Sequence, residues 1–358
     1  MTAIEKRLKN LRSKIKKSEA DAVLVTKREN YIYLSGFTGT MAYLVITAGK
    51  AVLITDFRYT EQASHQAPGY QIIQYKGSII NALKEVIEEN KIEKLAFEDF
   101  SMTVQSYTEL REKLGIKNFV PFGEAIEELR QIKDEGELET IKRAVEIADE
   151  TFTYILGSIK PGIAEVELAA EMEYHMKKLG ATGPSFETIV ASGKRASMPH
   201  GVASEKKLEA GDVITLDFGA LYNGYCSDMT RTVFLGEPVK ELARIYTIVL
   251  DAQLKSLEGV KKGRTGKEID LIARQIIAGA GFGDNFGHGL GHSVGLEIHE
   301  EPRLSMKGTK KMKDGMVVTV EPGIYVNGLG GVRIEDMVVV KGDSPVILTT
   351  STKEMIVI

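Results

Sequence analysis

Two kinds of hydrophobic pattern alternate along the first third of the chain. Short runs rich in branched apolar residues predict β-strands at residues 22–25, 43–46, 51–54 and 94–97, and Ala-Gly-Lys at 48–50 predicts a hairpin turn. Between these runs, apolar residues recur at helical spacing. This alternation of strand and helix patterns is typical of an α/β domain.

Amphipathic helices are predicted at three places in this first part. Near the N-terminus an apolar face recurs from Ile4 to Ile15, in a segment otherwise rich in Lys and Arg. The same spacing covers residues 78–89 and 103–114. No Gly-rich phosphate-binding loop accompanies these elements, because the Gly-Phe-Thr-Gly at 36–39 is too short a signal.

A capping box marks the start of the next long helix. Asp134 is followed three residues later by Glu137, and apolar residues at helical spacing then continue to Ile155. We expect this helix to end near Pro161 and a second helix to cover residues 164–179.

The length of 358 residues suggests two domains. The junction is expected near the capping box, within residues 125–135. We therefore divide the chain into an α/β domain at residues 1–128 and a second domain at residues 129–358.

The second part resembles itself at an offset of 104 residues: residues 211–219 read GDVITLDFG, and residues 315–323 read GMVVTVEPG. An Asn-Gly pair follows each copy, at Asn223 and Asn327. Two copies of one hairpin unit predict a domain with pseudo-twofold symmetry. Because Asp228 in the first copy corresponds best to Glu335, the second turn is expected to be about three residues longer.

Each hairpin copy carries two carboxylates. With Asn223-Gly224 as a two-residue turn, Asp228 lies opposite Gly219, which shares a strand face with Asp217. Glu321 and Glu335 are expected to lie the same way in the second copy. Four carboxylates in one place disfavour ionisation, so the pattern predicts divalent cations there. Carboxylates with an imidazole suit Mn²⁺, Co²⁺ or Zn²⁺.

Four of the six histidines lie in two short segments that contain glycine. His288, His292 and His299 lie within residues 287–300, and His200 lies in Met-Pro-His-Gly at 198–201. Separate structural histidines are the alternative explanation, but such clustering favours a shared site.

Composition and charge narrow the function classes. A hydrophobic fraction of 43% and a charged fraction of 27% are ordinary for a globular protein. The net charge of -4 and the absence of a basic block disfavour nucleic acid as a partner. No apolar run is long enough to span a membrane, and the N-terminus lacks the apolar core of a signal peptide. The single cysteine, Cys226, permits no intrachain disulfide, and a cytoplasmic location is expected.

Five sequence blocks, in this order along the chain, resemble the pita-bread metallopeptidases, which include methionine aminopeptidase, aminopeptidase P and prolidase. They are LDFG at 216–219, SDMTR at 227–231, the histidine segment 288–300, VEPG at 320–323 and VRIED at 332–336. The resemblance implies an α+β chain. A C-terminal pita-bread (creatinase/aminopeptidase) domain with pseudo-twofold symmetry would follow a creatinase-like α/β domain.

The resemblance also implies a set of metal ligands. The family's five ligands fall on Asp217, Asp228, His292, Glu321 and Glu335, and every position holds the expected residue type. Two divalent ions per subunit are implied, with Mn²⁺ as the first choice and Co²⁺ or Zn²⁺ as alternatives.

Catalytic roles follow from the same resemblance. Glu321 is implied as the general base, and His200 or His299 as the group that stabilises the oxyanion. Either His299 or Glu321 could deliver a proton to the leaving nitrogen. Arg333 is implied in positioning the substrate or ordering the metal ligands, and His288 in binding the substrate.

Residues 186–193 and 198–201 resemble the proline-specific branch of the family. The implied activity is hydrolysis of the Xaa-Pro bond at the N-terminus of peptides, as in aminopeptidase P, by a hydroxide bound to two metal ions. The alternatives are a prolidase that acts only on Xaa-Pro dipeptides and a non-catalytic peptide-binding relative. A metal-free hydrolase like creatinase is disfavoured because all five ligand positions are intact.

The resemblance further implies a homodimer formed through the N-terminal domain. Residues 36–39 and 56–59 would then narrow the partner's site.

Overall fold

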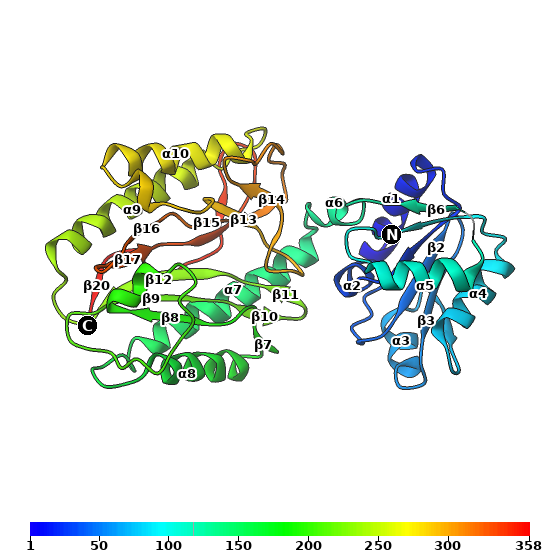
Figure 1. Ribbon diagram of the computed structural model, residues 1–358, viewed down its shortest axis with the longest axis horizontal. Coiled ribbons are helices and arrows are strands. Elements are labelled where there is room, and N and C mark those ends of the chain that lie inside the picture. The colour runs from blue at the N-terminus through cyan, green and yellow to red at the C-terminus, as the bar shows by residue number, and fades with distance from the viewer. Residues whose placement is uncertain (117) are drawn as a thin grey trace. The chain divides into compact units, whose positions relative to one another are not determined.

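Contacts between residues divide the described part of the chain, residues 1–116 and 118–358 of this computed structural model, into two units, Met1–Arg130 and Gln131–Ile358. Each unit has its own sheet structure and its own buried apolar side chains (Figure 1). No helix within the described residues is both long and apolar enough to cross a membrane.

The first unit is built on a six-stranded sheet with strand order β4-β3-β2-β1-β5-β6. Its strands are β1 (Ala22–Val25), β2 (Tyr43–Thr47), β3 (Ala51–Thr55), β4 (Gln71–Gln74), β5 (Lys94–Phe97) and β6 (Asn118–Pro121). Its helices are α1 (Ala3–Lys17), α2 (Arg28–Ser35), α3 (Thr60–Gln66), α4 (Ile79–Glu89), α5 (Val104–Leu114) and α6 (Glu127–Arg130). Strand β2 is antiparallel to both of its neighbours, whereas β1, β5 and β6 run parallel.

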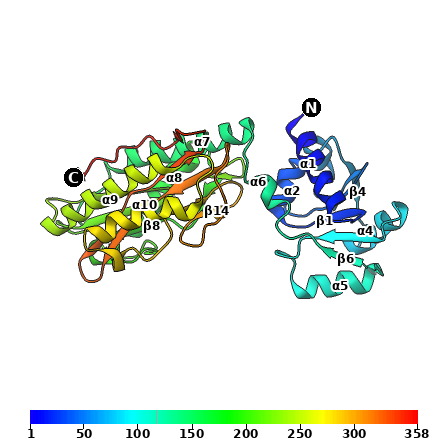
Figure 2. The same ribbon diagram turned by 90° about the horizontal axis from the view of Figure 1, so that it is seen from above.

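Helices cover both faces of this sheet, so its central strands are buried on both sides. Figure 2 shows α1 and α2 on one face and α4 and α5 on the other. Leu83 of α4 and Leu110 of α5 pack against the sheet in one apolar cluster. The four predicted strands and three predicted helices of this part are confirmed, and α2, α3, α6, β4 and β6 are additional.

The second unit contains four long helices and several small sheets. The helices are α7 (Glu135–Ile155), α8 (Glu165–Lys178), α9 (Lys240–Gly259) and α10 (Gly266–Gly279). The first group of strands is β7 (Gly183–Pro184), β8 (Ile189–Ser192), β9 (Val213–Phe218), β10 (Ala220–Tyr222), β11 (Tyr225–Cys226) and β12 (Met229–Phe234). The second group is β13 (Gly291–Ser293), β14 (Glu300–Leu304), β15 (Val317–Val320), β16 (Gly323–Val326), β17 (Gly330–Arg333), β18 (Asp336–Val339), β19 (Val346–Ile347) and β20 (Ile356–Val357).

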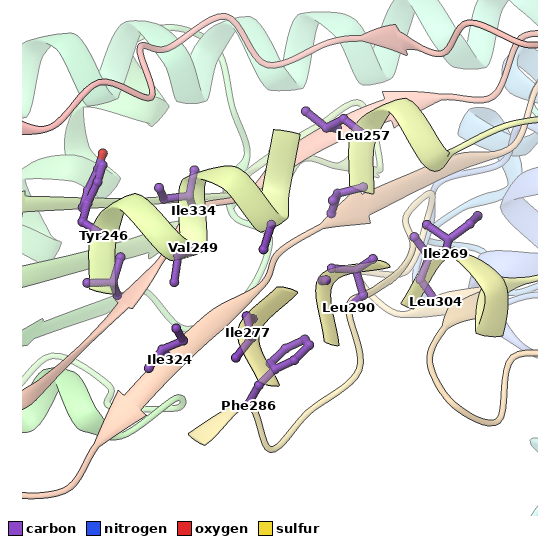
Figure 3. Close-up of a cluster of buried hydrophobic side chains, with 14 of the residues drawn as sticks. Tyr246, Val249, Leu257, Ile269, Ile277, Phe286, Leu290, Leu304, Ile324 and Ile334 are labelled. Atoms are coloured by element: carbon purple, nitrogen blue, oxygen red, sulfur yellow. The ribbon is translucent and has the colours of Figure 1, made fainter. Parts of the chain in front are cut away.

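The second unit repeats one arrangement: a pair of helices precedes a strand hairpin. Helices α7 and α8 pack on β8, β9 and β12 through one apolar cluster. Helices α9 and α10 pack on β15 and β16 through another, to which Val249 and Ile277 belong (Figure 3). The predicted internal duplication is therefore present in the structure.

Helix α7 begins as predicted but ends earlier. The Asp134 carboxylate accepts a hydrogen bond from the Glu137 backbone, and the Glu137 side chain returns one to the Asp134 backbone, which completes the capping box. The helix ends at Ile155 rather than near Pro161. Gly157 and Ser158 each bond to the carbonyl three residues earlier, so the chain tightens into turns there.

The first hairpin has the predicted register. Tyr222 pairs with Tyr225 around the two-residue turn, in which Asn223 has φ +47° and Gly224 φ +84°. Phe218 pairs with Met229 further along, so Gly219 lies opposite Asp228. A side chain at Gly219 would place its Cβ 1.8 Å from the Ser227 carbonyl oxygen, which explains the glycine.

The second hairpin differs from the prediction. Val326 pairs with Gly330, so its turn spans three residues, only one more than in the first copy. The pairs Gly323–Arg333 and Val320–Asp336 set a register that brings Glu321 directly opposite Glu335. Three extra residues were expected in the second turn, and only one lies there. The other two lie in the strand before Glu335, so Glu335 is two residues further from its turn than Asp228 is in the first hairpin. A shift of two residues preserves the strand face, so both glutamates still share one side.

The close contact at Gly219 predicts that one added methyl group strongly destabilises the fold. Gly219→Ala should lower the free energy of unfolding by about 1–3 kcal/mol or more, because the Ser227 backbone cannot move without breaking the hairpin. Gly183 in the neighbouring strand β7 is the matched control, since a Cβ there meets nothing within 4 Å. Gly183→Ala should leave the stability unchanged or raise it by up to about 1 kcal/mol. Equal losses in urea unfolding of the two variants would contradict this account.

Candidate active site

A cavity of about 570 Å³ in the second unit is lined by every residue that the sequence singled out for metal binding, substrate binding or catalysis. These residues are His200, Asp217, Asp228, His288, His292, His299, Glu321, Arg333 and Glu335. They come from both hairpins and from the segments that precede them. The two halves of the duplication thus meet at one site.

Two carboxylates from each hairpin face this cavity. Asp217 is in β9, Asp228 directly precedes β12, and Glu321 and Glu335 lie in the interruption between β15–β18 and β16–β17. The Thr230 hydroxyl donates a hydrogen bond of 2.7 Å to Glu335 and so links the two hairpins.

Burial and mutual repulsion govern the charge of these carboxylates. Burial, and then the charge of Glu335, raises the pKa of Asp228 well above its usual range. Burial, and then the charge of Glu321, does the same to the pKa of Glu335. Burial also opposes ionisation of Glu321, but the hydrogen bond to His292 and the charges of His292, His288 and Arg333 together outweigh burial and lower the pKa to about 2.

Arg333 supplies a fixed positive charge beside Asp217. Its Nη2 lies 2.5 Å from Asp217 Oδ2, its Nε donates to Thr230, and its Nη1 donates to the Tyr325 hydroxyl and the Pro199 carbonyl. The guanidinium is almost fully buried, so it orders the carboxylates and their surroundings rather than reaching freely into the cavity.

His292 lies between the carboxylates of the two hairpins. Its Nε2 is 3.5 Å from Asp228 Oδ2 and 3.3 Å from Glu321 Oε1. Its backbone N–H donates to the Thr319 hydroxyl, which itself donates to Glu321. This arrangement fixes the strand that carries the imidazole relative to the second hairpin.

The donor atoms present fit a divalent metal ion. Asp228, His292 and Glu335 each offer a ligand atom, and these atoms lie within 4.8 Å of one another. Asp217 Oδ1 and Glu335 Oε1 are buried without a hydrogen-bond partner among the described residues. Buried carboxylate oxygens are normally satisfied, so one such oxygen from each hairpin indicates room for a cation. Carboxylates with one imidazole are a donor set that Mn²⁺, Co²⁺ and Zn²⁺ accept.

The other three histidines have different surroundings. His299 packs edge-on against His292 with ring centroids 4.4 Å apart. Burial, and then the neighbouring His292 and Arg303, lowers its pKa to about 4, so its imidazole is neutral at neutral pH. Both nitrogens of His288 already have partners, at Gly289 and Tyr325, whereas His200 is exposed at the cavity.

Sequence reasoning missed two residues of the site. Tyr325 bridges Arg333 and His288 through its hydroxyl, with bonds of 2.7 and 3.0 Å. It lies diagonally across the second hairpin from Arg333, so the correct register would have revealed it. Arg303 lines the cavity opposite His292 in the β13–β14 pair, where an irregular register leaves no simple sequence signal.

Comparison with known proteins identifies the family. Residues 139–342 match the model of metallopeptidase family M24, and residues 7–132 match the creatinase/prolidase N-terminal domain. The chain is 40% identical to a Xaa-Pro dipeptidase of Pyrococcus horikoshii, over 99% of this chain and 100% of the relative.

Solved structures agree with this match. A Xaa-Pro dipeptidase from Bacillus anthracis shares 46% identity and a TM-score of 0.97, covering 99% of this chain and 100% of that one. An X-Pro aminopeptidase from Thermotoga maritima shares 40% identity and a TM-score of 0.91, covering 97% and 100%. The chain belongs to metallopeptidase family M24. The pita-bread domain and the creatinase-like N-terminal domain implied by its sequence are thereby confirmed.

The raised pKa of Asp228 predicts a pH dependence of stability in metal-free protein. An acid whose pKa is higher folded than unfolded loses stability as pH rises from the unfolded value through the folded one. Metal-free Asp228→Asn should therefore be more stable than metal-free wild type at pH 8, with the gap closing toward pH 4. Mn²⁺ at about 100 times its dissociation constant should stabilise wild type by ~2.7 kcal/mol and the variant by less.

Thermal unfolding with chelator and with Mn²⁺ measures both effects. The exposed Asp284 offers a control, because Asp284→Asn should change neither the pH dependence nor the response to Mn²⁺. A stability gap between Asp228→Asn and wild type that does not vary with pH would contradict the electrostatic account.

Proposed function

We propose that this chain is a metal-dependent peptidase that hydrolyses the bond between an N-terminal residue and a following proline. The observation that carries the proposal is the buried donor set, in which carboxylates from both hairpins and His292 surround one cavity. The proline specificity is supported by relatives named Xaa-Pro dipeptidase and X-Pro aminopeptidase at 40–46% identity over nearly the whole chain. All cavity-lining residues lie between Phe186 and Glu335, so catalysis belongs to the predicted domain 129–358.

Asp217, Asp228, His292, Glu321 and Glu335 are the residues we assign to hold two divalent ions, with Mn²⁺ as the first choice. When bound, these ions supply the Lewis acidity that activates water for attack on the peptide carbonyl. The raised pKa values of Asp228 and Glu335 mean that metal must compete with protons there, so the apparent metal affinity rises with pH.

The protein's own groups then divide the proton chemistry. Glu321 is ionised at neutral pH and faces the cavity, so we assign it the role of proton acceptor. His299 is neutral there because its pKa is about 4, which suits a hydrogen-bond donor to the developing oxyanion rather than a proton donor to the leaving nitrogen. By elimination, the proton that Glu321 takes up is the one passed to the proline nitrogen.

Arg303 bears on the length of the substrate. Its side chain lines the cavity, and among the described residues it has no ion-pair partner, unlike Arg333. Its charge contributes to the low pKa of His299, which places the guanidinium near that imidazole. An unpaired arginine in the cavity suits the free carboxylate of a Xaa-Pro dipeptide. On this basis we favour the dipeptidase over the aminopeptidase P type that the sequence favoured.

The aminopeptidase type is the second candidate. Its support is the Thermotoga maritima structure named X-Pro aminopeptidase, whose identity of 40% equals that of the Pyrococcus horikoshii dipeptidase. The homodimer formed through the N-terminal domain and the cytoplasmic location remain predictions from the sequence.

Hydrolysis of matched peptides tests the function. Metal-stripped protein with Mn²⁺ restored should release the amino acid from Xaa-Pro, and Xaa-Ala should be cut much less. Cleavage of Xaa-Pro-Yaa with equal efficiency would favour the aminopeptidase type. A fully metal-loaded protein that cuts none of these peptides would refute the proposed function.

Replacement of Arg303 separates the two substrate classes. Arg303→Met should raise KM for Xaa-Pro by roughly 10–100-fold through loss of a charge-assisted bond, and should change KM for the uncharged Xaa-Pro-amide little. Each substrate thus serves as the control for the other, in one variant. An equal rise of KM on both would show that Arg303 does not bind the terminal carboxylate.

A further inference from the structure

A lysine at the start of the second unit is buried without taking part in the chemistry above. The Lys133 side chain is only 1% exposed, and its ammonium donates to Ser293 Oγ at 3.2 Å and to Glu300 Oε2 at 3.1 Å. Its backbone N–H is fixed as well, by a 2.9 Å bond to the Gly315 carbonyl. Lysine is rarely buried unless its charge is paired, so this placement calls for a reason.

The two partners of Lys133 are the two ends of one loop. Ser293 ends β13, Glu300 begins β14, and the two are Cα partners at the point where the register of that pair shifts. The loop between them spans residues 294–299 and has His299 as its last residue. The Lys133 ammonium therefore bonds to the residue before this loop and to the residue after it, and we call this pair of bonds the clasp.

The loop is folded around the Glu300 carboxylate. The Glu297 backbone N–H donates to Glu300 Oε1, leaving Oε2 to Lys133. A Cβ at Gly295 would lie 2.6 Å from Oε1, so a larger residue there would have to displace the Glu300 carboxylate. The Gly295 carbonyl accepts from the Cys226 backbone, which ties the loop to the first hairpin.

Both ends of the clasp adjoin a histidine of the site. Ser293 follows His292, and Glu300 follows His299, and the two imidazoles pack edge-on with centroids 4.4 Å apart. We propose that Lys133 is a positioning residue that acts through His299, by closing the 294–299 loop so that this imidazole is held against His292 and faces the cavity. The proposal rests on the proposed function only for the role of His299 in peptide hydrolysis.

An alternative is a buried ion pair that only stabilises the fold. Such pairs contribute little that well-packed apolar residues could not, so stability alone is a weak reason for one. A clasp, by contrast, needs a group that bonds two separate acceptors at fixed points. The ammonium of Lys133 meets that need at Ser293 and Glu300.

A double-mutant cycle in the Mn²⁺-loaded, full-length protein tests this role. Lys133→Met should lower kcat/KM for Xaa-Pro by roughly 10–100-fold, as for other residues that orient a metal site from behind. In a His299→Ala background, the same change should cost less than about twofold further, because the imidazole it positions is already absent. An equal loss in both backgrounds would overturn the proposal.

Two further variants control for an unpaired buried charge and for loss of a lysine in general. Lys133→Met with Glu300→Gln removes both charges, so it tests the clasp without leaving a lone buried carboxylate, and it should show the same dependence on His299. Lys262→Met is the matched control: its ammonium bonds Asp314 at 2.7 Å on the exposed surface, and its loss should not alter kcat/KM.

Hydrogen exchange separates this proposal from the proposed function. Amides of residues 294–299 should exchange faster in the Lys133→Met, Glu300→Gln variant than in wild type, whatever the enzyme cuts. If wild type proved inactive on Xaa-Pro peptides, the proposed function would fail while faster loop exchange would still support the clasp. Unchanged exchange in this loop would refute the clasp even if wild type were fully active.

Discussion

The site depends on one electrostatic conflict: four carboxylates are held around one cavity, with Asp228 and Glu335 buried and Asp217 and Glu321 half-buried. Burial and repulsion raise the pKa of Asp228 and Glu335, while the Arg333 guanidinium offsets only part of the negative charge. One oxygen each of Asp217 and Glu335 has no hydrogen-bond partner among the described residues. Such an arrangement is costly as it stands, and divalent cations resolve it.

The duplicated fold is what brings these charges together. Each hairpin presents two carboxylates on one strand face, and the halves are joined behind the site by Arg231. Its Nη1 donates to the carbonyls of Thr230 and Glu335, one in each half, and its Nη2 pairs with the fully buried Asp336. The Thr230 hydroxyl adds a second link to the Glu335 carboxylate. The positions of these carboxylates are thus set by paired backbones rather than by flexible loops, as a preorganised metal site would require.

Much of this arrangement could be predicted from the sequence because it depends on local patterns. Short runs of branched apolar residues predicted the strands, Asn223-Gly224 predicted the first turn, and the repeat pointed to paired carboxylates. The rest depends on tertiary structure. The register that brings Glu321 opposite Glu335 follows from a three-residue turn, whose length the sequence comparison overestimated. Arg303 lies beside a strand irregularity, and Lys133 bonds to a residue 167 positions away, so no sequence spacing indicates either of them.

Anomalous diffraction at the manganese edge, from crystals grown with Mn²⁺, tests the central claim most directly. Two peaks per chain are predicted, both contacting the carboxylates and shared between the hairpins, with His292 contacting one of them. One peak would mean that the four carboxylates need a single ion and a retained proton. No peak at full Mn²⁺ concentration, with the carboxylates unchanged in position, would contradict the claim that cations resolve the buried charge.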